Sequence, residues 1–228
     1  MADKETASYP MRINKYLALK KISTRRGADE LVKEKKVFIN GKLAVLGSKV
    51  LEKDKVEVKG APEKEYVYFA YNKPIGIETG EDLPAQAGLF PLGRLDKASH
   101  GLMILTNDGR ITDQLLNPKY IHEKEYVVKT LNKLRSNFKQ KMEAGVNIEG
   151  YMTKPCKVQI LNDFAFRVTL TEGKKHQIRR MCSNLFQEVA DLKRERIMNI
   201  KLGKLGSNSM REIKGEELST FLNQVLQK

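Results

Sequence analysis

The chain has 228 residues and a formal net charge of +14, from 42 Lys and Arg against 28 Asp and Glu. No apolar run approaches the roughly 18 residues of a membrane-spanning helix, and residues 1–10 lack the apolar core of a signal peptide. Two distant cysteines and three histidines without metal-ligand spacing argue against disulfides and a zinc site, so we expect a cytoplasmic protein that binds a polyanion such as nucleic acid.

Residues 1–10 are interpreted as a disordered leader. Apolar residues share one face of a predicted helix over 13–17 and of a second helix over 28–32, which Ser23 is expected to cap. The basic pair Arg25-Arg26 falls in the first turn of the second helix, where the helix dipole disfavours cations and a bound phosphate would relieve the conflict. Asn40-Gly41 between two apolar runs predicts a β-hairpin, and 56–58 predicts a further strand.

This N-terminal pattern resembles the S4 RNA-binding domain. Four segments carry the resemblance: Arg12-Ile13-Asn14-Lys15-Tyr16-Leu17, Ser23-Thr24-Arg25-Arg26-Gly27, Val37-Phe38-Ile39-Asn40-Gly41-Lys42 and Asp54-Lys55-Val56-Glu57-Val58. Residues 1–60 hold 15 Lys and Arg and 8 Asp and Glu, a net +7 that is half of the chain's excess charge. We therefore expect an S4 domain over 11–59 with Arg25 and Arg26 as RNA contacts, the alternative being a solvated basic surface without a ligand.

Residues 60–65 are small, charged and proline-containing, and they are interpreted as a linker. Beyond them, apolar runs predict strands that alternate with short helices. The predicted strands lie at 66–71, 102–106, 122–129, 166–170, 188–193 and 196–202, and the predicted helices at 111–116, 134–142 and 218–225. Mostly antiparallel strands with interspersed helices indicate a larger α+β domain over 66–228.

The stretch at 90–109 places charged side chains directly before a buried strand. Leu102–Thr106 is apolar and closes in Asn-Asp-Gly, while Arg94 and Asp96 precede it between two glycines. A carboxylate at the edge of a core strand has little water around it and needs a cationic or hydrogen-bonding partner. Taken alone, Asp96 is more often a turn aspartate that caps the local backbone, so the other motifs must decide between that and a catalytic role.

Three separated segments resemble the RsuA/RluF-type pseudouridine synthases, in which an S4 domain precedes the catalytic domain. They are Gly93-Arg94-Leu95-Asp96 with Ser99 and Gly101-Leu102, then Lys124-Glu125-Tyr126, then Glu172-Gly173 with His176-Gln177-Ile178-Arg179-Arg180-Met181. Three others are most similar to the RluF-like branch, which acts on large-subunit (23S) ribosomal RNA: His122-Glu123-Lys124-Glu125-Tyr126, Cys156-Lys157-Val158 and Arg196-Ile197-Met198-Asn199. The chain departs from the family pattern at Ala98, where an acid is common, and at Asn208-Ser209-Met210-Arg211.

The resemblance implies isomerisation of a uridine to pseudouridine, in which the bond from uracil N1 to ribose C1′ breaks and C5 joins C1′. The product is an isomer, so we expect no cofactor and no metal. Asp96 is implied as the catalytic carboxylate, acting as nucleophile or as base, with Arg179 as the cation that keeps it ionised. Tyr126 is implied to stack on the flipped-out base and to assist proton transfer at C5.

The resemblance also implies RNA contacts in the catalytic domain, at Lys73, Arg94, Lys175, His176, Gln177 and Arg180. No proton role is assigned to His176. The alternatives are a small-subunit rRNA or tRNA substrate, and a non-catalytic S4-type RNA-binding protein of ribosome assembly. A glycosidase-like hydrolase is disfavoured because such enzymes pair two carboxylates and only one stands out. The expected partner is ribosomal RNA, and the expected state is a monomer.

Overall fold

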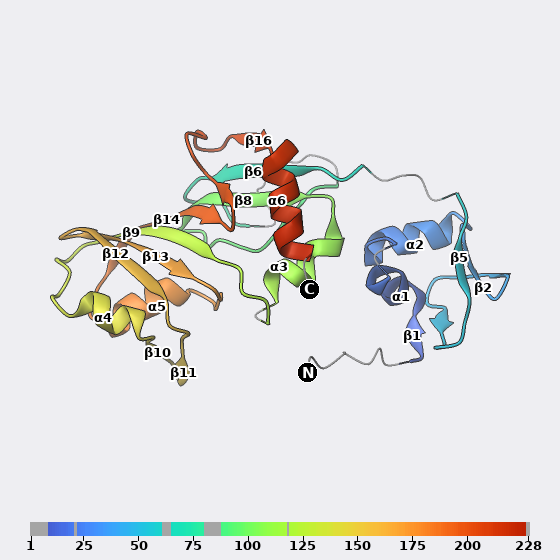
Figure 1. Ribbon diagram of the computed structural model, residues 1–228, viewed down its shortest axis with the longest axis horizontal. Coiled ribbons are helices and arrows are strands. Elements are labelled where there is room, and N and C mark those ends of the chain that lie inside the picture. The colour runs from blue at the N-terminus through green and yellow to red at the C-terminus, as the bar shows by residue number, and fades with distance from the viewer. Residues whose placement is uncertain (1–8, 21, 61–64, 80–87, 118, 227–228) are drawn as a thin grey trace. The chain divides into compact units, whose positions relative to one another are not determined.

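The chain folds into two units, residues 1–66 with 108–110 and residues 67–107 with 111–228. The structure, a computed structural model, describes residues 9–20, 22–60, 65–79, 88–117 and 119–226 (Figure 1). Most of the predicted leader over 1–10 and of the predicted linker over 60–65 therefore lies outside the described residues. Within those ranges no helix is long and apolar enough to cross a membrane.

The N-terminal unit packs two short helices against short antiparallel strands, as the sequence predicted. Its elements are β1 (Met11–Arg12), α1 (Ile13–Leu19), α2 (Arg25–Lys33), β2 (Val37–Ile39), β3 (Lys42–Leu43), β4 (Lys49–Val50) and β5 (Val56–Val58). Strand β1 pairs with β4, and a second sheet has the order β3-β2-β5. The hairpin turn at Asn40 and Gly41 has positive φ at both residues, +50° and +77°, which is the turn that the Asn-Gly pair predicts. Figure 1 shows these elements in blue.

Helix α2 is capped by Thr24 and not by Ser23, so the predicted cap was one residue early. The Thr24 Oγ1 accepts a hydrogen bond from the Gly27 N–H at 2.9 Å, while Ser23 is buried. Arg25 and Arg26 consequently occupy the first turn, where there is no acidic residue. Both side chains are exposed, so the positive end of the helix carries two further positive charges that face solvent.

The larger unit is built on a mixed sheet of nine strands. Its strands are β6 (Tyr68–Lys73), β7 (Phe90–Pro91), β8 (His100–Thr106), β9 (Lys124–Thr130), β12 (Lys157–Asn162), β13 (Ala165–Leu170), β14 (Val189–Ile197), β15 (Ile200–Lys201) and β16 (Met210–Glu212). The main order is β12-β13-β9-β14-β8-β6-β16, with β15 on β14 and β7 on β8. Only the β14–β8 pair of this sheet is parallel among the described strands, which confirms the predicted mostly antiparallel α+β fold.

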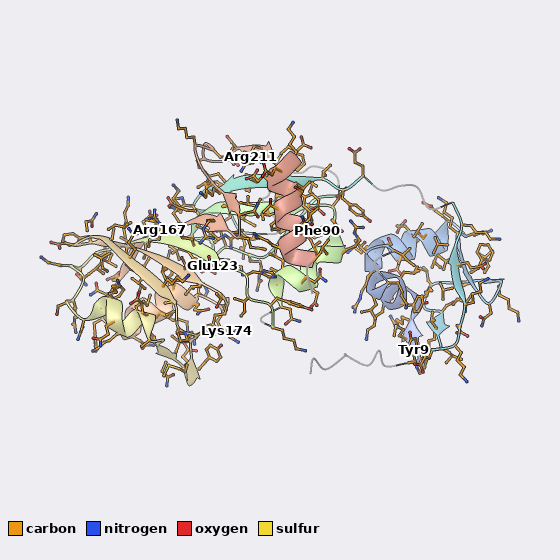
Figure 2. All side chains as sticks on the ribbon, viewed as in Figure 1. Tyr9, Phe90, Glu123, Arg167, Lys174 and Arg211 are labelled. Carbon is orange, nitrogen blue, oxygen red and sulfur yellow. The ribbon has the colours of Figure 1, made fainter. Side chains whose placement is uncertain are left out.

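Helices cover parts of the sheet and complete its core. They are the 3-10 turn at Gly109–Ile111, α3 (Thr112–Leu116), α4 (Phe138–Glu143), α5 (Gln177–Asn184) and α6 (Gly215–Leu226), and a separate hairpin pairs β10 (Asn147–Ile148) with β11 (Tyr151–Met152). Helices α4 and α5 bury Phe138, Met142, Ile178 and Met181 against the strands β9, β12, β13 and β14 (Figure 1). Helix α6 is tied to β16 by Arg211, labelled in Figure 2, whose guanidinium contacts both carboxylate oxygens of Glu217 at 2.6 and 2.7 Å.

Two predicted elements were wrong in extent. The helix predicted over 134–142 begins only at Phe138, because the Leu134 N–H donates to the Asp163 carbonyl at 2.7 Å in a non-helical segment. Leu134 still packs on the same core as Phe138, so its apolar character reflected burial and not helical periodicity.

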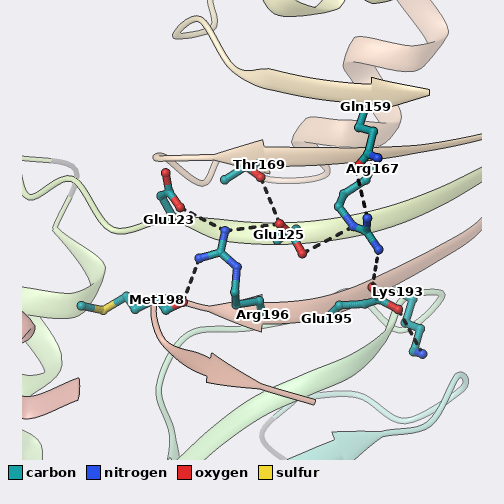
Figure 3. Close-up of polar contacts among 9 residues, drawn as sticks. All are labelled: Glu123, Glu125, Gln159, Arg167, Thr169, Lys193, Glu195, Arg196 and Met198. Carbon is teal, nitrogen blue, oxygen red and sulfur yellow. Dashed lines mark hydrogen bonds and ion pairs between the residues drawn. The ribbon is translucent and has the colours of Figure 1, made fainter. Parts of the chain in front are cut away.

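The strands predicted at 188–193 and 196–202 are one long strand, β14, followed by a tight turn and the short β15. The charged residues in its middle have partners on neighbouring strands. Arg194 is 3% exposed and donates its Nε to the Leu102 carbonyl at 2.6 Å, while Arg196 lies 3.0 Å from Glu123 (Figure 3). Because cross-strand partners compensate these charges, the strand continues where the sequence suggested a break.

Candidate active site

Asp96 lies in a turn between β7 and β8 whose backbone is fixed on both sides. The Thr79 hydroxyl donates to the Leu95 carbonyl at 2.8 Å and accepts from the Leu95 N–H at 3.2 Å. The Gly76 N–H donates to the Lys97 carbonyl at 2.9 Å, and the Asp96 carbonyl accepts from the Ser99 N–H at 2.9 Å. The turn therefore holds the Asp96 carboxylate in a defined position before any ligand arrives.

The end of this turn depends on Gly101, which has a φ of +104° and lies directly opposite Arg194 in the parallel β8–β14 pair. A Cβ atom at Gly101 would approach the Arg194 carbonyl oxygen to 2.3 Å. Any other residue would push β8 away from β14, and the Asp96 turn would move with β8. The glycine that follows Asp96 in the motif thus serves close backbone approach.

The Asp96 carboxylate contacts His176. The two side chains meet at 3.1 Å, from Asp96 Oδ2 to His176 Nδ1, and the Asp96 side chain is 32% exposed. His176 is the residue before α5 and has a left-handed backbone conformation, with a φ of +51°. The sequence had suggested His176 only as an RNA contact, because nothing in the local pattern shows that it faces Asp96.

The loop that carries His176 is anchored by Glu172, a buried carboxylate in the same motif. Glu172 accepts hydrogen bonds from the Tyr151 hydroxyl at 2.6 Å, the Gln177 Nε2 at 2.8 Å and the Lys154 N–H at 3.0 Å. Burial raises the pKa of Glu172, but these hydrogen bonds together lower it below its ordinary value. Gln177, which the sequence predicted to contact RNA, is therefore a buried anchor in this structure.

Tyr126 on β9 lies against the same turn from the other side. Its half-buried ring packs on the apolar cluster of Tyr71, Leu95 and Met103, and also on the core beneath α5. Leu95 directly precedes Asp96, so Tyr126 and the carboxylate turn border the same apolar cluster although Asp96 and Tyr126 are 30 positions apart in the sequence.

The Arg179 side chain supports the Asp96 turn by binding a backbone carbonyl of that turn, and it does not pair with the Asp96 carboxylate. Its guanidinium donates to the Ala98 carbonyl at 2.9 Å and to the Val189 carbonyl at 3.2 Å. Within the described ranges Asp96 has no ion pair with Arg179 at 4.0 Å or less, and His176 takes that position. The expected direct cation at Asp96 is therefore replaced in this structure by an imidazole contact and an arginine that fixes the residues after Asp96.

Lys73, which the sequence predicted to contact an RNA phosphate, is fully buried in this structure. Its ammonium group donates to the carbonyls of Ile77 at 2.7 Å and Pro74 at 3.0 Å. Burial, with a smaller contribution from the charge of Arg194, lowers the pKa of Lys73 below its ordinary value, although the nearby Asp96 acts in the opposite direction. The buried charge of Lys73 thus acts on Asp96 from beneath the turn.

A second lysine with a shifted pKa, which the sequence did not single out, lies on the same strand as Tyr126. Burial in the sheet, together with the charge of Arg194, lowers the pKa of Lys124 to about 8. Side chains alternate along a strand, so Lys124 and Tyr126 project from the same face of β9. A lysine two positions before an aromatic residue was visible in the sequence, but its burial was not.

The remaining side chains that were predicted to contact RNA differ in their exposure and in their contacts within the protein. Arg94 and Lys175 are exposed, as are Arg25 and Arg26 of the N-terminal unit. Arg180 is half-buried and engaged within the protein, where it contacts Glu149 at 2.6 Å and donates to the Ile148 carbonyl at 3.3 Å. Arg180 must exchange an exposed acidic partner for a phosphate if it contacts RNA.

Comparison with known proteins gives this arrangement a context. Residues 67–184 match the family model described as RNA pseudouridylate synthase, and residues 11–56 match the S4 domain. The chain is 40% identical over 223 residues to the Dual-specificity RNA pseudouridine synthase RluF of Escherichia coli, covering 91% of this chain and 77% of that protein. It is 34% identical to the Ribosomal large subunit pseudouridine synthase B of Bacillus subtilis, covering 91% and 93%. A crystal structure of a pseudouridylate synthase superposes with a TM-score of 0.70 at 27% identity, covering 95% of this chain and all of that one.

Proposed function

The chain belongs to the RNA pseudouridylate synthase family, and on that premise we propose that it converts a uridine of large-subunit ribosomal RNA to pseudouridine with Asp96 as its catalytic carboxylate. The substrate class is suggested by the Bacillus subtilis relative, whose name refers to the large ribosomal subunit. The net charge of +14 suits a polyanionic partner. We further expect the protein to be a monomer. We also expect that it needs no cofactor, because the substrate and product are isomers.

One observation carries the assignment of Asp96. A carboxylate that is one-third exposed stands in a turn whose backbone is held by Thr79, Gly76 and Arg179. A turn aspartate that only capped its own backbone would not need anchors from two separate segments, the loop that holds Gly76 and Thr79 and the helix that holds Arg179. Groups that are held in position before the reaction require little reorganisation in the transition state, which favours a catalytic role for Asp96.

The chemistry assigns Asp96 to the sugar of a flipped-out uridine. As a nucleophile, a carboxylate oxygen bonds to ribose C1′ while the bond from C1′ to uracil N1 breaks and the uracil leaves as an anion. The uracil then turns, its C5 attacks C1′, and Asp96 is released. The proton lost from C5 is balanced by a proton gained at N1. As a base, Asp96 would instead take a proton from the sugar carbon next to C1′. Both routes require the Asp96 carboxylate to lie beside the sugar of the target uridine.

The neighbouring side chains fit supporting roles. The Tyr126 ring offers a stacking surface for the uracil, and its hydroxyl is available to assist proton transfer at C5. Its hydroxyl makes no hydrogen bond to other residues of the described chain, which leaves it free for a ligand. Arg179 holds the turn through the Ala98 carbonyl, and the buried ammonium group of Lys73 interacts electrostatically with Asp96.

Mapping of pseudouridines in ribosomal RNA from cells with and without this gene tests the proposal. We expect one or a few large-subunit positions to lose pseudouridine in the deletion and to regain it with the parent gene, but not with a gene encoding Asp96→Asn. Loss of sites only in the small subunit or in tRNA would replace the proposed substrate. Restoration by Asp96→Asn would remove Asp96 from the mechanism.

A further inference from the structure

Phe186, directly after α5, combines two features that are unfavourable for an isolated folded chain. It has a left-handed backbone conformation, with a φ of +59°, and its side chain is 70% exposed. The left-handed conformation ends α5, where the Phe186 N–H donates to the Ser183 carbonyl and the Gln187 N–H to the Cys182 carbonyl, both at 2.9 Å, and glycine is the usual residue there. This helix end does not explain why a large aromatic side chain is left in solvent. The exposed ring points to a ligand that uses it.

One face of the Phe186 ring is already covered by a cation. The guanidinium carbon of Arg135 lies 4.7 Å from the ring centroid, and Arg135 is itself exposed. The high exposure of Phe186 leaves the other face of the ring to solvent. A flat aromatic group arriving there would stack on the ring, with the positive charge of Arg135 behind it.

A surface cavity of about 490 Å³ adjoins this ring. Its wall includes Phe186, Asn132, Gln187 and Arg179. Gln187 is 3% exposed, and its Oε1 has no hydrogen-bond partner in the part of the chain that the structure describes, although its Nε2 contacts the Lys133 carbonyl at 3.4 Å. Buried acceptors without a partner are rare, and a turn of the amide toward the cavity would let an N–H group of a ligand satisfy this one.

Arg179 links this cavity to the candidate active site. The same guanidinium that borders the cavity donates to the Ala98 carbonyl, two residues after Asp96. An RNA strand that presents a uridine to Asp96 must continue beyond it in both directions.

We propose that the cavity binds an unpaired nucleobase of the RNA substrate next to the target uridine, stacked on Phe186 and bordered by Asn132 and Gln187. This inference rests on the proposed function, since it assumes that RNA reaches Asp96. A nucleobase fits the observations because it offers an aromatic face for Phe186 and N–H and carbonyl groups for the amide side chains. Base–aromatic stacking tolerates every base, so Phe186 contributes affinity without selecting a sequence.

The test compares Phe186→Ala with the matched variant Phe164→Ala in the full chain. Phe164 is also an exposed phenylalanine of the same unit, at 49% exposure, and it is not part of the cavity wall. The probe is a fluorescein-labelled oligouridylate of about 12 nucleotides, long enough for a single-strand site. We expect Phe186→Ala to bind it roughly 5- to 100-fold more weakly, the range of base–aromatic stacking, while Phe164→Ala stays within about twofold of the parent and Phe186→Tyr retains affinity.

A second measurement locates the contact directly. Photocrosslinking of the parent to an oligonucleotide that contains 4-thiouridine should label the tryptic peptide Met181–Lys193, in which Phe186 is the only aromatic residue. Equal affinities of the Phe186 and Phe164 variants, with crosslinks confined to other peptides, would overturn the proposal and leave the cavity to a protein partner. Binding is measured here without conversion, so a parent that binds through Phe186 but forms no pseudouridine would refute the proposed function alone.

Discussion

Among the described residues of 9–60 in the N-terminal unit, Arg25 and Arg26 project into solvent from the first turn of α2, and the ion pairs are made by lysines. Arg110, which belongs to the same unit, pairs with Asp108. In the larger unit Arg94 is exposed, but several other arginines are engaged within the protein. Arg196 and Arg211 pair with acids, whereas Arg179 and Arg194 donate to backbone carbonyls. The labelled Arg167 in Figures 2 and 3 contacts both Glu125 and Glu195.

This difference separates two uses of the same side chain. An exposed arginine without an acidic partner can contact a phosphate without first breaking a contact in the protein. An arginine that holds a carbonyl or closes an ion-pair network stabilises the fold, and its removal leaves a buried group unpaired. We therefore expect the N-terminal unit to contribute mainly to RNA affinity and the larger unit to contribute the chemistry.

The largest effect is expected from Asp96→Asn, which removes the anionic oxygen and keeps the size of the side chain. The rate of pseudouridine formation should fall by about a thousandfold or more, because no other carboxylate stands in the turn. RNA affinity and the thermal unfolding midpoint should stay close to the parent values. Single-turnover conversion of a radiolabelled RNA, measured beside binding, checks both parts. A variant that kept most of its rate would place the chemistry elsewhere.

The next effect is expected from Tyr126→Phe, which keeps the ring packed on Leu95 and loses only the hydroxyl. The conversion rate should fall by roughly a hundredfold if the hydroxyl assists proton transfer, while the fold is unchanged. Tyr71→Phe is a useful control, because Tyr71 is buried in the same cluster and its hydroxyl donates to Asn208 at 2.7 Å instead of facing a ligand. Full turnover by Tyr126→Phe would reduce its role to stacking.

A smaller effect on stability is expected from Glu172→Gln, which weakens the anchor of the His176 loop. Glu172 is 4% exposed and accepts three hydrogen bonds, so the free energy of unfolding at pH 7 should fall by about 1–3 kcal/mol. The folded-state pKa lies below the ordinary 4.5, so the stabilisation by Glu172 is present above that pH and is lost as the pH falls below it.

Denaturant unfolding of parent and Glu172→Gln between pH 3 and pH 7 measures this dependence. The difference between the two proteins should shrink below about pH 4.5, where the parent also loses its ionised carboxylate. Glu149→Gln is the matched control, since the Glu149 side chain is 80% exposed and its removal should hardly change stability or its pH dependence. A constant difference across the pH range would mean that Glu172 acts through packing alone.

The sequence predicted those parts of the fold whose signals are local. The Asn40-Gly41 turn and the apolar run at Leu102–Thr106 each determine their conformation within a few residues, and both were confirmed. The short strand β16 was not predicted, because it pairs with β6, far away in the chain. Strands β10, β11 and β12 pair locally, and they were missed because they are two residues long or mostly exposed and so carry no alternating apolar pattern. The division of β14 was wrong because the partners of its charged residues lie elsewhere in the chain, Glu123 and Glu125 for Arg196 and Arg167 for Glu195.

The candidate site was also predicted only in part from the sequence. Sequence motifs indicated the residues near Asp96 and Tyr126, but they could not show which cations are buried. Lys73 and Gln177 were expected at the RNA surface and are instead internal anchors. The contact between His176 and Asp96 depends on a left-handed residue directly before α5, and that conformation is uncommon for residues other than glycine, so the local sequence does not predict it.

The smallest effect, and the sharpest test of the comparison, is expected from replacing both Arg25 and Arg26 by Ala. Each phosphate contact that is lost should lower the slope of log affinity against log salt by roughly one unit, so the double variant should lose about one to two units. The control is Lys36→Ala with Lys55→Ala, which removes the same charge from the same unit but from lysines already paired with Glu34 and Glu57. Its slope should change less.

Turnover distinguishes the two units in this experiment. Phosphate contacts position RNA without taking part in the reaction, so saturating RNA should restore most of the conversion rate of the Arg25 and Arg26 variant. Saturation should not restore Asp96→Asn, because its defect lies in the chemical step. An unchanged salt slope would mean that the two arginines do not touch phosphate. A rate that excess RNA cannot restore would mean that the N-terminal unit helps to order the active site, and the separation between affinity and chemistry drawn from the arginines would then be wrong.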